Sequence, residues 1–267
     1  MTNSTVVCER LEDGIACLTL NSPKTRNALS DGGSVNSLLE WLGLLDADHS
    51  VRVIILTGAG TAFSAGGDLK TMVAGEGPIS TKPDITRTNY RTGIQRLPIA
   101  FETLNVPVIA AVNGPAIGAG CDLACMCDLR IAAESAVFAE SFVKLGLIPG
   151  DGGAWLLPRI VGFAKASEMA LTGDRLNSSD ALACGLVSQV VPGEKLIEAA
   201  VALARRIAAN PPGAVRMTRR LLREAQSARL ETVLELSSAM QALAHTTTEH
   251  KESLAAALRK VGKTDHK

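Results

Sequence analysis

The stretch from Asn113 to Asp128 holds the residues best suited to chemistry: Asn-Gly-Pro-Ala-Ile-Gly-Ala-Gly-Cys-Asp-Leu-Ala-Cys-Met-Cys-Asp. The apolar run Val106 to Val112 before it is typical of a buried strand, and the apolar segment Cys121 to Cys127 is typical of a helix. A glycine-rich turn between a strand and a helix leaves backbone N–H groups free, and these attract negative charge. Asp122 adds one acid to this apolar element. Together these features indicate chemistry at an oxygen that gains negative charge.

A second turn of the same kind lies upstream. The apolar run Val51 to Thr57 leads into Gly58 to Lys70, which contains Phe-Ser-Ala-Gly-Gly-Asp-Leu at 63–69. One glycine-rich turn is a weak signal, because such turns are common. Two of them, each after a strand, could aim two N–H groups at the same oxygen, which is a more specific pattern.

The elements that must position these turns alternate between strand-like and helix-like patterns. The strand-like runs are 6–7, 15–20, 51–57, 106–112, 129–132 and 187–191, and the helical patterns are 31–46, 88–104, 121–127, 164–171 and 178–184. This alternation predicts an α/β fold with a largely parallel sheet. After Pro192 the pattern is helical alone, over 194–210, 213–229 and 230–261.

With these motifs in this order, the chain resembles the enoyl-CoA hydratase/isomerase (crotonase) superfamily. The segments that carry the resemblance are 20–29, 63–69, 113–128, 145–153, 157–162, 171–173, 181–187 and 190–191. The resemblance implies an α/β fold of the crotonase type, a spiral of ββα units with a C-terminal helical region. It places the spiral core with the CoA and acyl site at 1–195 and a helical oligomerisation region at 196–267, in homotrimers or dimers of trimers.

Family members bind acyl-CoA thioesters and stabilise a thioester enolate with two backbone N–H groups. Matching the motifs assigns these donors to Ala65 and Ala119, although ordinary tight turns would look the same in sequence. Ala119 stands where hydratases often carry glycine, a mild departure because the donor is a backbone group. The resemblance implies that the substrate contacts Ala65, Gly66, Gly67, Asp68, Leu69, Ile117, Gly118, Ala119 and Phe142.

Asp122 matches the first of the two catalytic glutamates of typical hydratases, with a side chain that is one methylene shorter. The second glutamate falls on Phe142, which cannot transfer a proton. Glu140 and Asp151 are the nearby acids that could replace it; alternatively, each caps a turn or carries a surface charge. Asp151 lies one residue after a position that holds the catalytic acid in some family isomerases and dehalogenases.

Lys24, Arg26 and Ala28 match the family segment that lies along the CoA nucleotide, where cations could contact phosphates. Solvated surface charge is the alternative for Lys24 and Arg26. For Asp68 and Asp128 the resemblance favours a structural role that braces loops.

The most direct function is an enoyl-CoA hydratase, a lyase that adds water across the double bond of a 2-enoyl-CoA. Asp122 would act as acid/base with Glu140 or Asp151. The alternatives are an enoyl-CoA isomerase, which needs one acid/base, and a CoA-thioester-binding homologue without activity. No cofactor is expected, because coenzyme A is part of the substrate.

The composition limits the other classes of function. The 267 residues are 46% hydrophobic and 3% aromatic, with a formal net charge of zero, so neither nucleic acid nor a membrane is an expected partner. The cysteines lie mostly in apolar segments and the cluster 121, 125 and 127 has no nearby histidine, so no metal site is expected. No signal peptide is seen, and we expect a reducing cytoplasm.

Overall fold

The computed structural model describes residues 4–29, 32–74, 77 and 79–264, and its largest element is a mostly parallel sheet. The strand order is β1 (Val6–Arg10), β2 (Ile15–Leu20), β3 (Val53–Gly58), β4 (Val108–Val112), β6 (Leu129–Ala133) and β9 (Gln189–Val191). β1 is antiparallel to β2 and the other pairs are parallel. The predicted α/β class is therefore confirmed.

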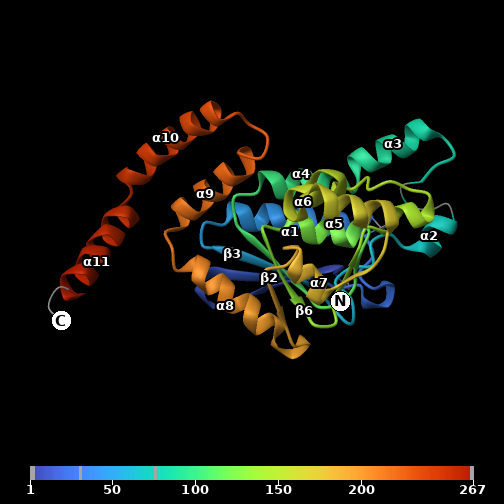
Figure 1. The fold of residues 1–267 in the computed structure, drawn as a ribbon, viewed down its shortest axis with the longest axis horizontal. Helices are drawn as coiled ribbons and strands as arrows, with labels where there is room; N and C mark the ends of the chain where they lie inside the picture. The colour runs from blue at the N-terminus through green and yellow to red at the C-terminus, as the bar shows by residue number, and fades with distance from the viewer. Residues whose placement is uncertain (1–3, 30–31, 75–76, 78, 265–267) are drawn as a thin grey trace.

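Helices cover both faces of this sheet (Figure 1). Ile54 and Leu56 of β3 belong to one apolar cluster, and their neighbours Val53 and Ile55 belong to another on the opposite face. Side chains that alternate along a strand point to opposite faces, so a strand buried on both faces reads as a continuous apolar run. This explains why the central strands were readable from the sequence.

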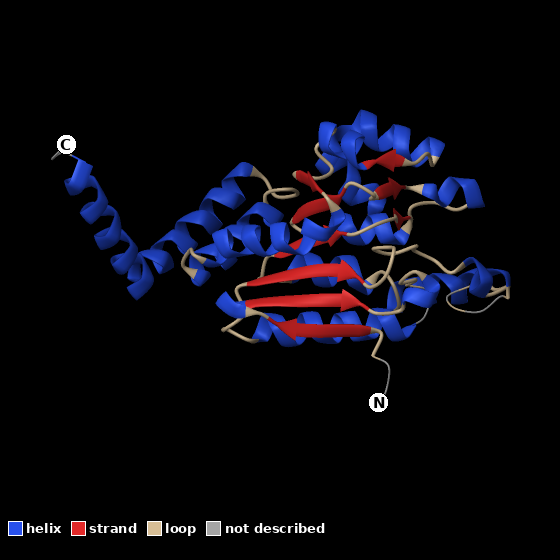
Figure 2. Ribbon diagram, turned by 90° about the horizontal axis from the view of Figure 1, so that it is seen from below, coloured by secondary structure: helices blue, strands red, loops and turns tan. Residues whose placement is uncertain are grey.

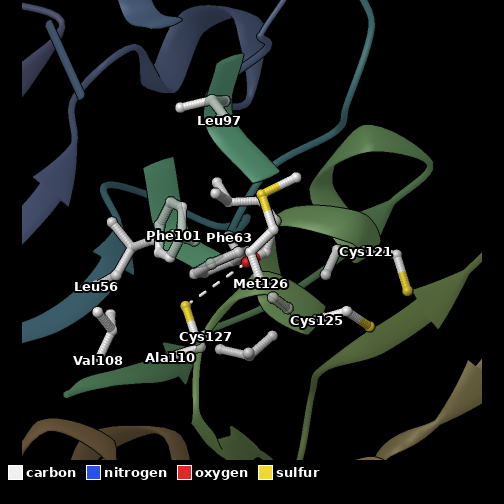
Figure 3. Packing of buried hydrophobic residues seen from close by; sticks show 14 of the residues in the cluster. Leu56, Phe63, Leu97, Phe101, Val108, Ala110, Cys121, Cys125, Met126 and Cys127 are labelled. Atoms are coloured by element: carbon white, nitrogen blue, oxygen red, sulfur yellow. Dashed lines mark hydrogen bonds between the residues drawn. The ribbon is translucent and has the colours of Figure 1, made fainter. Parts of the chain in front are cut away.

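The larger cluster lies under α1 (Gly32–Ala47), α4 (Arg96–Thr103), α5 (Ala119–Met126) and α6 (Gly153–Thr172). Every residue of α5 is buried, so its cysteines pack as small apolar side chains (Figure 3). The Cys127 thiol contacts the carbonyl of Leu123 at 3.5 Å. Because it is enclosed in this way, α5 gives its acid a fixed position.

The opposite face is covered by α8 (Leu196–Ala208), whose Ala200 and Ala204 are fully buried against the strands. Small side chains let the helix lie close to the sheet. The predicted boundary at residue 195 assigns α8 to the C-terminal region, whereas in the structure α8 packs on the sheet.

A second, three-stranded sheet consists of β5 (Ala116–Ile117), β7 (Val137–Ala139) and β8 (Leu176–Asn177). These strands are too short for a periodic sequence pattern, and the sequence did not predict them. The expected helix over 88–104 is two helices, α3 (Pro83–Thr92) and α4, because Gly93 between them has non-helical angles (φ −105°, ψ −113°). The remaining short helices are α2 (Leu69–Val73) and α7 (Ser178–Ala183).

The chain ends in α9 (Pro212–Glu224), α10 (Leu230–Thr246) and α11 (Thr248–Thr264), of which α10 and α11 extend away from the body (Figures 1 and 2). α9 is tied to the core through Asp128, which accepts hydrogen bonds from Arg219 (2.8 Å), Arg223 (2.7 Å) and the Val108 N–H (2.8 Å). Asp128 is thus placed as a brace. Over the described residues, no helix is both long and apolar enough to cross a membrane.

Candidate active site

The two glycine-rich turns meet backbone to backbone. Ser64 forms a parallel bridge with Ala116, and its carbonyl accepts the Ile117 N–H at 3.0 Å. A Cβ on Gly120 would lie 2.2 Å from the Ser64 oxygen, and one on Gly66 would lie 2.3 Å from the Ile117 oxygen. Only glycine permits this approach, so these positions bring the turns together as the sequence pattern predicted.

The first turn has two N–H groups that are already engaged. The Ala65 N–H donates to the Arg26 carbonyl at 2.9 Å, and the Gly66 N–H donates to the Ser64 hydroxyl at 3.2 Å. The predicted role of Ala65 as a donor to substrate is therefore contradicted, because its hydrogen is used within the fold. Gly67 is the next residue and lines the adjacent cavity, which makes it the better candidate donor.

The second turn supplies the start of α5. Gly118 precedes the helix with φ +53°, which glycine adopts without strain, and Ala119 is the first helical residue. N–H groups in the first turn of a helix have no partner within the helix and carry partial positive charge. Ala119 lines the same cavity as Gly67, so the arrangement suits an oxygen that develops negative charge.

The cavity has a volume of about 210 Å³ and a mainly apolar lining. Its described lining includes the predicted contacts Ala65, Gly67, Leu69, Ile117, Gly118, Ala119 and Phe142, together with Leu29, Tyr90, Lys144, Leu147 and Asp151. The structure thus brings most of the predicted site residues to a single hollow. Asp151 is the one acid in this described lining.

Asp122 and Glu140 are outside the described lining of the cavity and are fully buried, with exposed fractions of 0% and 1%. Among the described residues, none of their four carboxyl oxygens accepts a hydrogen bond of good geometry, although the two carboxyl groups and the Gly153 N–H lie close enough to influence one another. Burial, reinforced by the charge of neighbouring Glu140, raises the pKa of Asp122 well above its usual range, and burial raises the pKa of Glu140 to about 7. Two such neighbours cannot both ionise easily, so the pair retains a proton near neutral pH.

The start of α6 is built around the carboxyl group of Asp122. A Cβ on Gly153 would lie 2.1 Å from an oxygen of Asp122, so a side chain at this position would collide with the acid. The Gly153 N–H favours the charged form of Asp122 and opposes the increase in its pKa. Gly153 was part of a recognised motif, but its contact with Asp122 could not be read from the sequence.

Asp151 lies where the cavity meets the Pro149–Gly152 turn and is 6% exposed. Burial raises its pKa to about 6. Burial raises the pKa of Tyr90, and the charge of Asp151 raises it further, which places the two side chains near each other. Glu140 and Asp151, the two acids proposed to replace the missing glutamate, are both buried near Asp122. Asp151 is the one that lines the cavity.

Phe142 occupies the cavity wall beside the second turn, with ring atoms 3.5–3.9 Å from the Cβ position of Gly118. An aromatic ring therefore fills the region where the resemblance predicts a catalytic glutamate. The Phe142 ring offers water no hydrogen bond on this wall of the cavity and cannot exchange a proton.

The predicted nucleotide-binding residues lie beside the first turn. Lys24 and Arg26 are exposed, while Ala28 is buried. Arg26 has φ +54°, and its carbonyl holds the Ala65 N–H. Asp68 caps α2 by accepting the Lys70 N–H at 2.9 Å, which fits the predicted bracing role.

Comparison with known proteins places these features in one family. Residues 10–263 match the family model described as enoyl-CoA hydratase/isomerase. The chain is 38% identical over 257 residues to the 1,2-epoxyphenylacetyl-CoA isomerase of Escherichia coli, covering 95% of each chain. It is 36% identical over 246 residues to the 2,3-dehydroadipyl-CoA hydratase of the same organism, covering 92% of each.

The solved structures agree with the fold. An enoyl-CoA hydratase from Bacillus anthracis superposes with a TM-score of 0.88 at 33% identity, covering 96% of each chain. The predicted crotonase-type architecture is therefore confirmed.

Proposed function

Because the chain belongs to the enoyl-CoA hydratase/isomerase family, we propose that it adds water across the C2–C3 double bond of a 2-enoyl-CoA thioester. The observation that carries this proposal is the group of three buried acids, Asp122, Glu140 and Asp151, beside the paired turns. Hydration needs one group to take a proton from water and another to supply one, and the raised pKa values suit both tasks near neutral pH.

The proposed reaction runs through a thioester enolate. The N–H groups of Gly67 and Ala119 donate to the thioester oxygen, and these bonds strengthen as charge develops on it. Asp151 takes a proton from water as the hydroxyl oxygen bonds to C3. Asp122, one helical turn after Ala119, delivers the proton that it holds with Glu140 to C2. The proton taken by Asp151 then restores the pair, so atoms and charge balance.

Isomerisation is the second candidate, and Phe142 is the observation that favours it. Its ring stands where a second catalytic glutamate is expected, and Asp151 is the acid in the described lining of the cavity. Moving a proton between C4 and C2 of an enoyl thioester needs one acid/base and no bound water. The apolar wall of Phe142 suits that reaction.

The test is the ultraviolet absorbance of the conjugated enoyl thioester. Crotonyl-CoA loses this absorbance on hydration, whereas a 3-enoyl-CoA gains it on isomerisation. Loss with the first substrate supports the hydratase, and gain with the second alone supports the isomerase. Thermal stabilisation by acyl-CoA without either change would support a binding protein and contradict both activities.

The finer details of the site and of the assembly are also part of this proposal. Lys24, Arg26 and Ala28 contact the CoA nucleotide, and the C-terminal helices join copies into homotrimers or dimers of trimers. Water and acid/base groups suffice for the reaction, so no cofactor is invoked. The six cysteines are free thiols, which is in keeping with a reducing cytoplasm.

A further inference from the structure

A second cavity adjoins the catalytic one. It has a volume of about 610 Å³ and lies between α3, Gln95 at the start of α4, and the segment 147–150. Tyr90 and Leu147 line both cavities, and the Tyr90 ring lies 3.6 Å from the Cβ position of Gly150. Tyr90 is therefore the wall between the two spaces, next to Asp151. The second cavity therefore begins on the side of Tyr90 that faces away from the first.

The walls of the second cavity combine an apolar surface with two cations. Its described lining is Ile79, Thr86, Arg87, Tyr90, Arg91, Gln95, Leu147, Ile148 and Gly150. Arg87 and Arg91 are the charged residues in this set, and no acid accompanies them. The Gln95 side chain is held by the Gly150 carbonyl at 2.8 Å. The lining thus suits methylene groups followed by an anion.

The two cations are exposed side chains of the same helix. Arg87 and Arg91 are separated by one turn of α3, and like charges at this spacing repel. Among the described residues, neither forms an ion pair, and Asp84 in the preceding turn is not within ion-pair distance of Arg87. The helix dipole favours Arg91 in the last turn of α3, and a bound carboxylate would offset the repulsion between the two cations further.

We propose that this cavity binds the far end of an acyl chain that terminates in a carboxylate, held by Arg87 and Arg91. The substrate class is the CoA thioester of a dicarboxylic acid. This inference rests on the proposed acyl-CoA site, and it adds the chemical nature of the acyl group. The other anionic groups of such a substrate are the CoA phosphates, which lie at the opposite end of the molecule from the acyl terminus.

The test uses saturated thioesters, whose binding requires no turnover. Calorimetry compares adipyl-CoA with hexanoyl-CoA, which has the same chain length and a methyl end. We expect adipyl-CoA to bind wild type about tenfold more tightly, since a charge-assisted contact contributes that much. The double variant Arg87→Gln with Arg91→Gln should lose this preference and leave hexanoyl-CoA binding within about twofold of wild type.

Two control variants separate charge from structure. Arg96→Gln removes a cation that bonds Asn36 at 2.8 Å outside this cavity, and it should keep the preference. Arg91→Lys keeps the charge and should retain most of the preference for adipyl-CoA. Equal binding of the two thioesters by wild type would overturn the proposal. Equal weakening of both by the double variant would also overturn it, because the arginines would then hold the CoA phosphates.

The outcomes also separate this inference from the proposed function. If both thioesters bind equally while crotonyl-CoA is hydrated, the dicarboxylate proposal fails alone. If the adipyl preference is found and no enoyl thioester reacts, the hydratase proposal fails alone. If neither thioester binds, both proposals fail.

Discussion

At the scale of residues, the proposed chemistry depends on acids that have been removed from water. Asp122→Asn keeps the size of the side chain and removes its proton. We expect kcat for crotonyl-CoA to fall roughly a hundredfold to ten-thousandfold, the usual contribution of general acid–base catalysis. Steady-state absorbance kinetics measure this change. Asp48→Asn, which removes an acid that pairs with Arg10 outside the cavity, should leave kcat unchanged, and equal losses in both variants would count against the assignment.

The raised pKa of Glu140 predicts how the stability of the protein depends on pH. Its pKa is raised to about 7 in the folded state, so the folded protein binds the proton more tightly than the unfolded chain does. This contribution is present below about pH 4.5 and is lost as the pH rises towards 7, with a magnitude on the order of 3 kcal/mol. Urea unfolding should therefore show a decline in the free energy of unfolding over this range. Asp151, whose pKa is raised to about 6, adds to the decline.

Glu140→Gln removes the titrating group and should flatten that decline. The variant should be more stable than wild type at pH 7.5, because no charge has to be buried. An unchanged pH dependence in the variant would mean that Glu140 does not titrate in this range.

Residue types were readable from the sequence, while the direction of an N–H group was not. The pattern identified Asp122, Glu140, Asp151 and the two turns. It assigned the first donor to Ala65. Only the structure reveals that the Ala65 N–H donates to the Arg26 carbonyl. Likewise, the burial of the acids depends on residues far apart in the chain, so the direction of the pKa change of Asp122 could not be predicted.

At the scale of elements, the site depends on how closely the two turns approach. Gly120→Ala adds a methyl group that would lie 2.2 Å from the Ser64 oxygen, although alanine suits the helix itself. We expect the turns to separate and kcat/KM to fall by more than about tenfold, since displacements of this size misplace reacting groups. Thermal unfolding should show a lower Tm.

The matched control is Gly43→Ala in α1. Apart from its chain neighbours and the backbone of its own helix turn, no described atom lies within 4 Å of its Cβ position, so the substitution should stabilise the protein by roughly 0.5–1 kcal/mol through helix propensity alone. Normal activity in Gly120→Ala would show that close contact between the turns is not needed.

Long apolar elements were predicted well and irregular ones were not. The strand expected at 15–20 is β2, and the helix expected at 31–46 is α1 to within one residue at each end. By contrast, α6 begins at Gly153 rather than 164, because its first half contains Pro158 and Gly162, which interrupt a helical pattern. Tertiary packing, absent from local propensity, determines such segments.

At the scale of the whole molecule, α10 and α11 form an arm that lacks a covering layer in the single chain (Figure 2). Leu254 and Leu258 lie one turn apart on α11 and are 53% and 65% exposed. Exposed apolar side chains at this spacing are typical of a helix that packs against a partner.

Charges on this face should therefore break the proposed assembly. Light scattering of wild type should give a mass of three or six chains, and the double variant Leu254→Glu with Leu258→Glu should give a smaller assembly. Glu252→Gln, a polar change on the opposite face of the same helix, should have no effect. A monomeric wild type would contradict the proposed role of the arm.

The central claim is that the cavity stabilises a thioester enolate and that the buried acids move its proton. The most direct test is exchange of the C2 hydrogens of butyryl-CoA in deuterium oxide, followed by NMR, because this exchange needs only enolate formation. We predict deuterium at C2 with wild type, a rate at least about tenfold lower with Asp122→Asn, and normal exchange with Asp48→Asn. Tight binding of butyryl-CoA without exchange, or exchange that is unaffected by Asp122→Asn, would contradict the account.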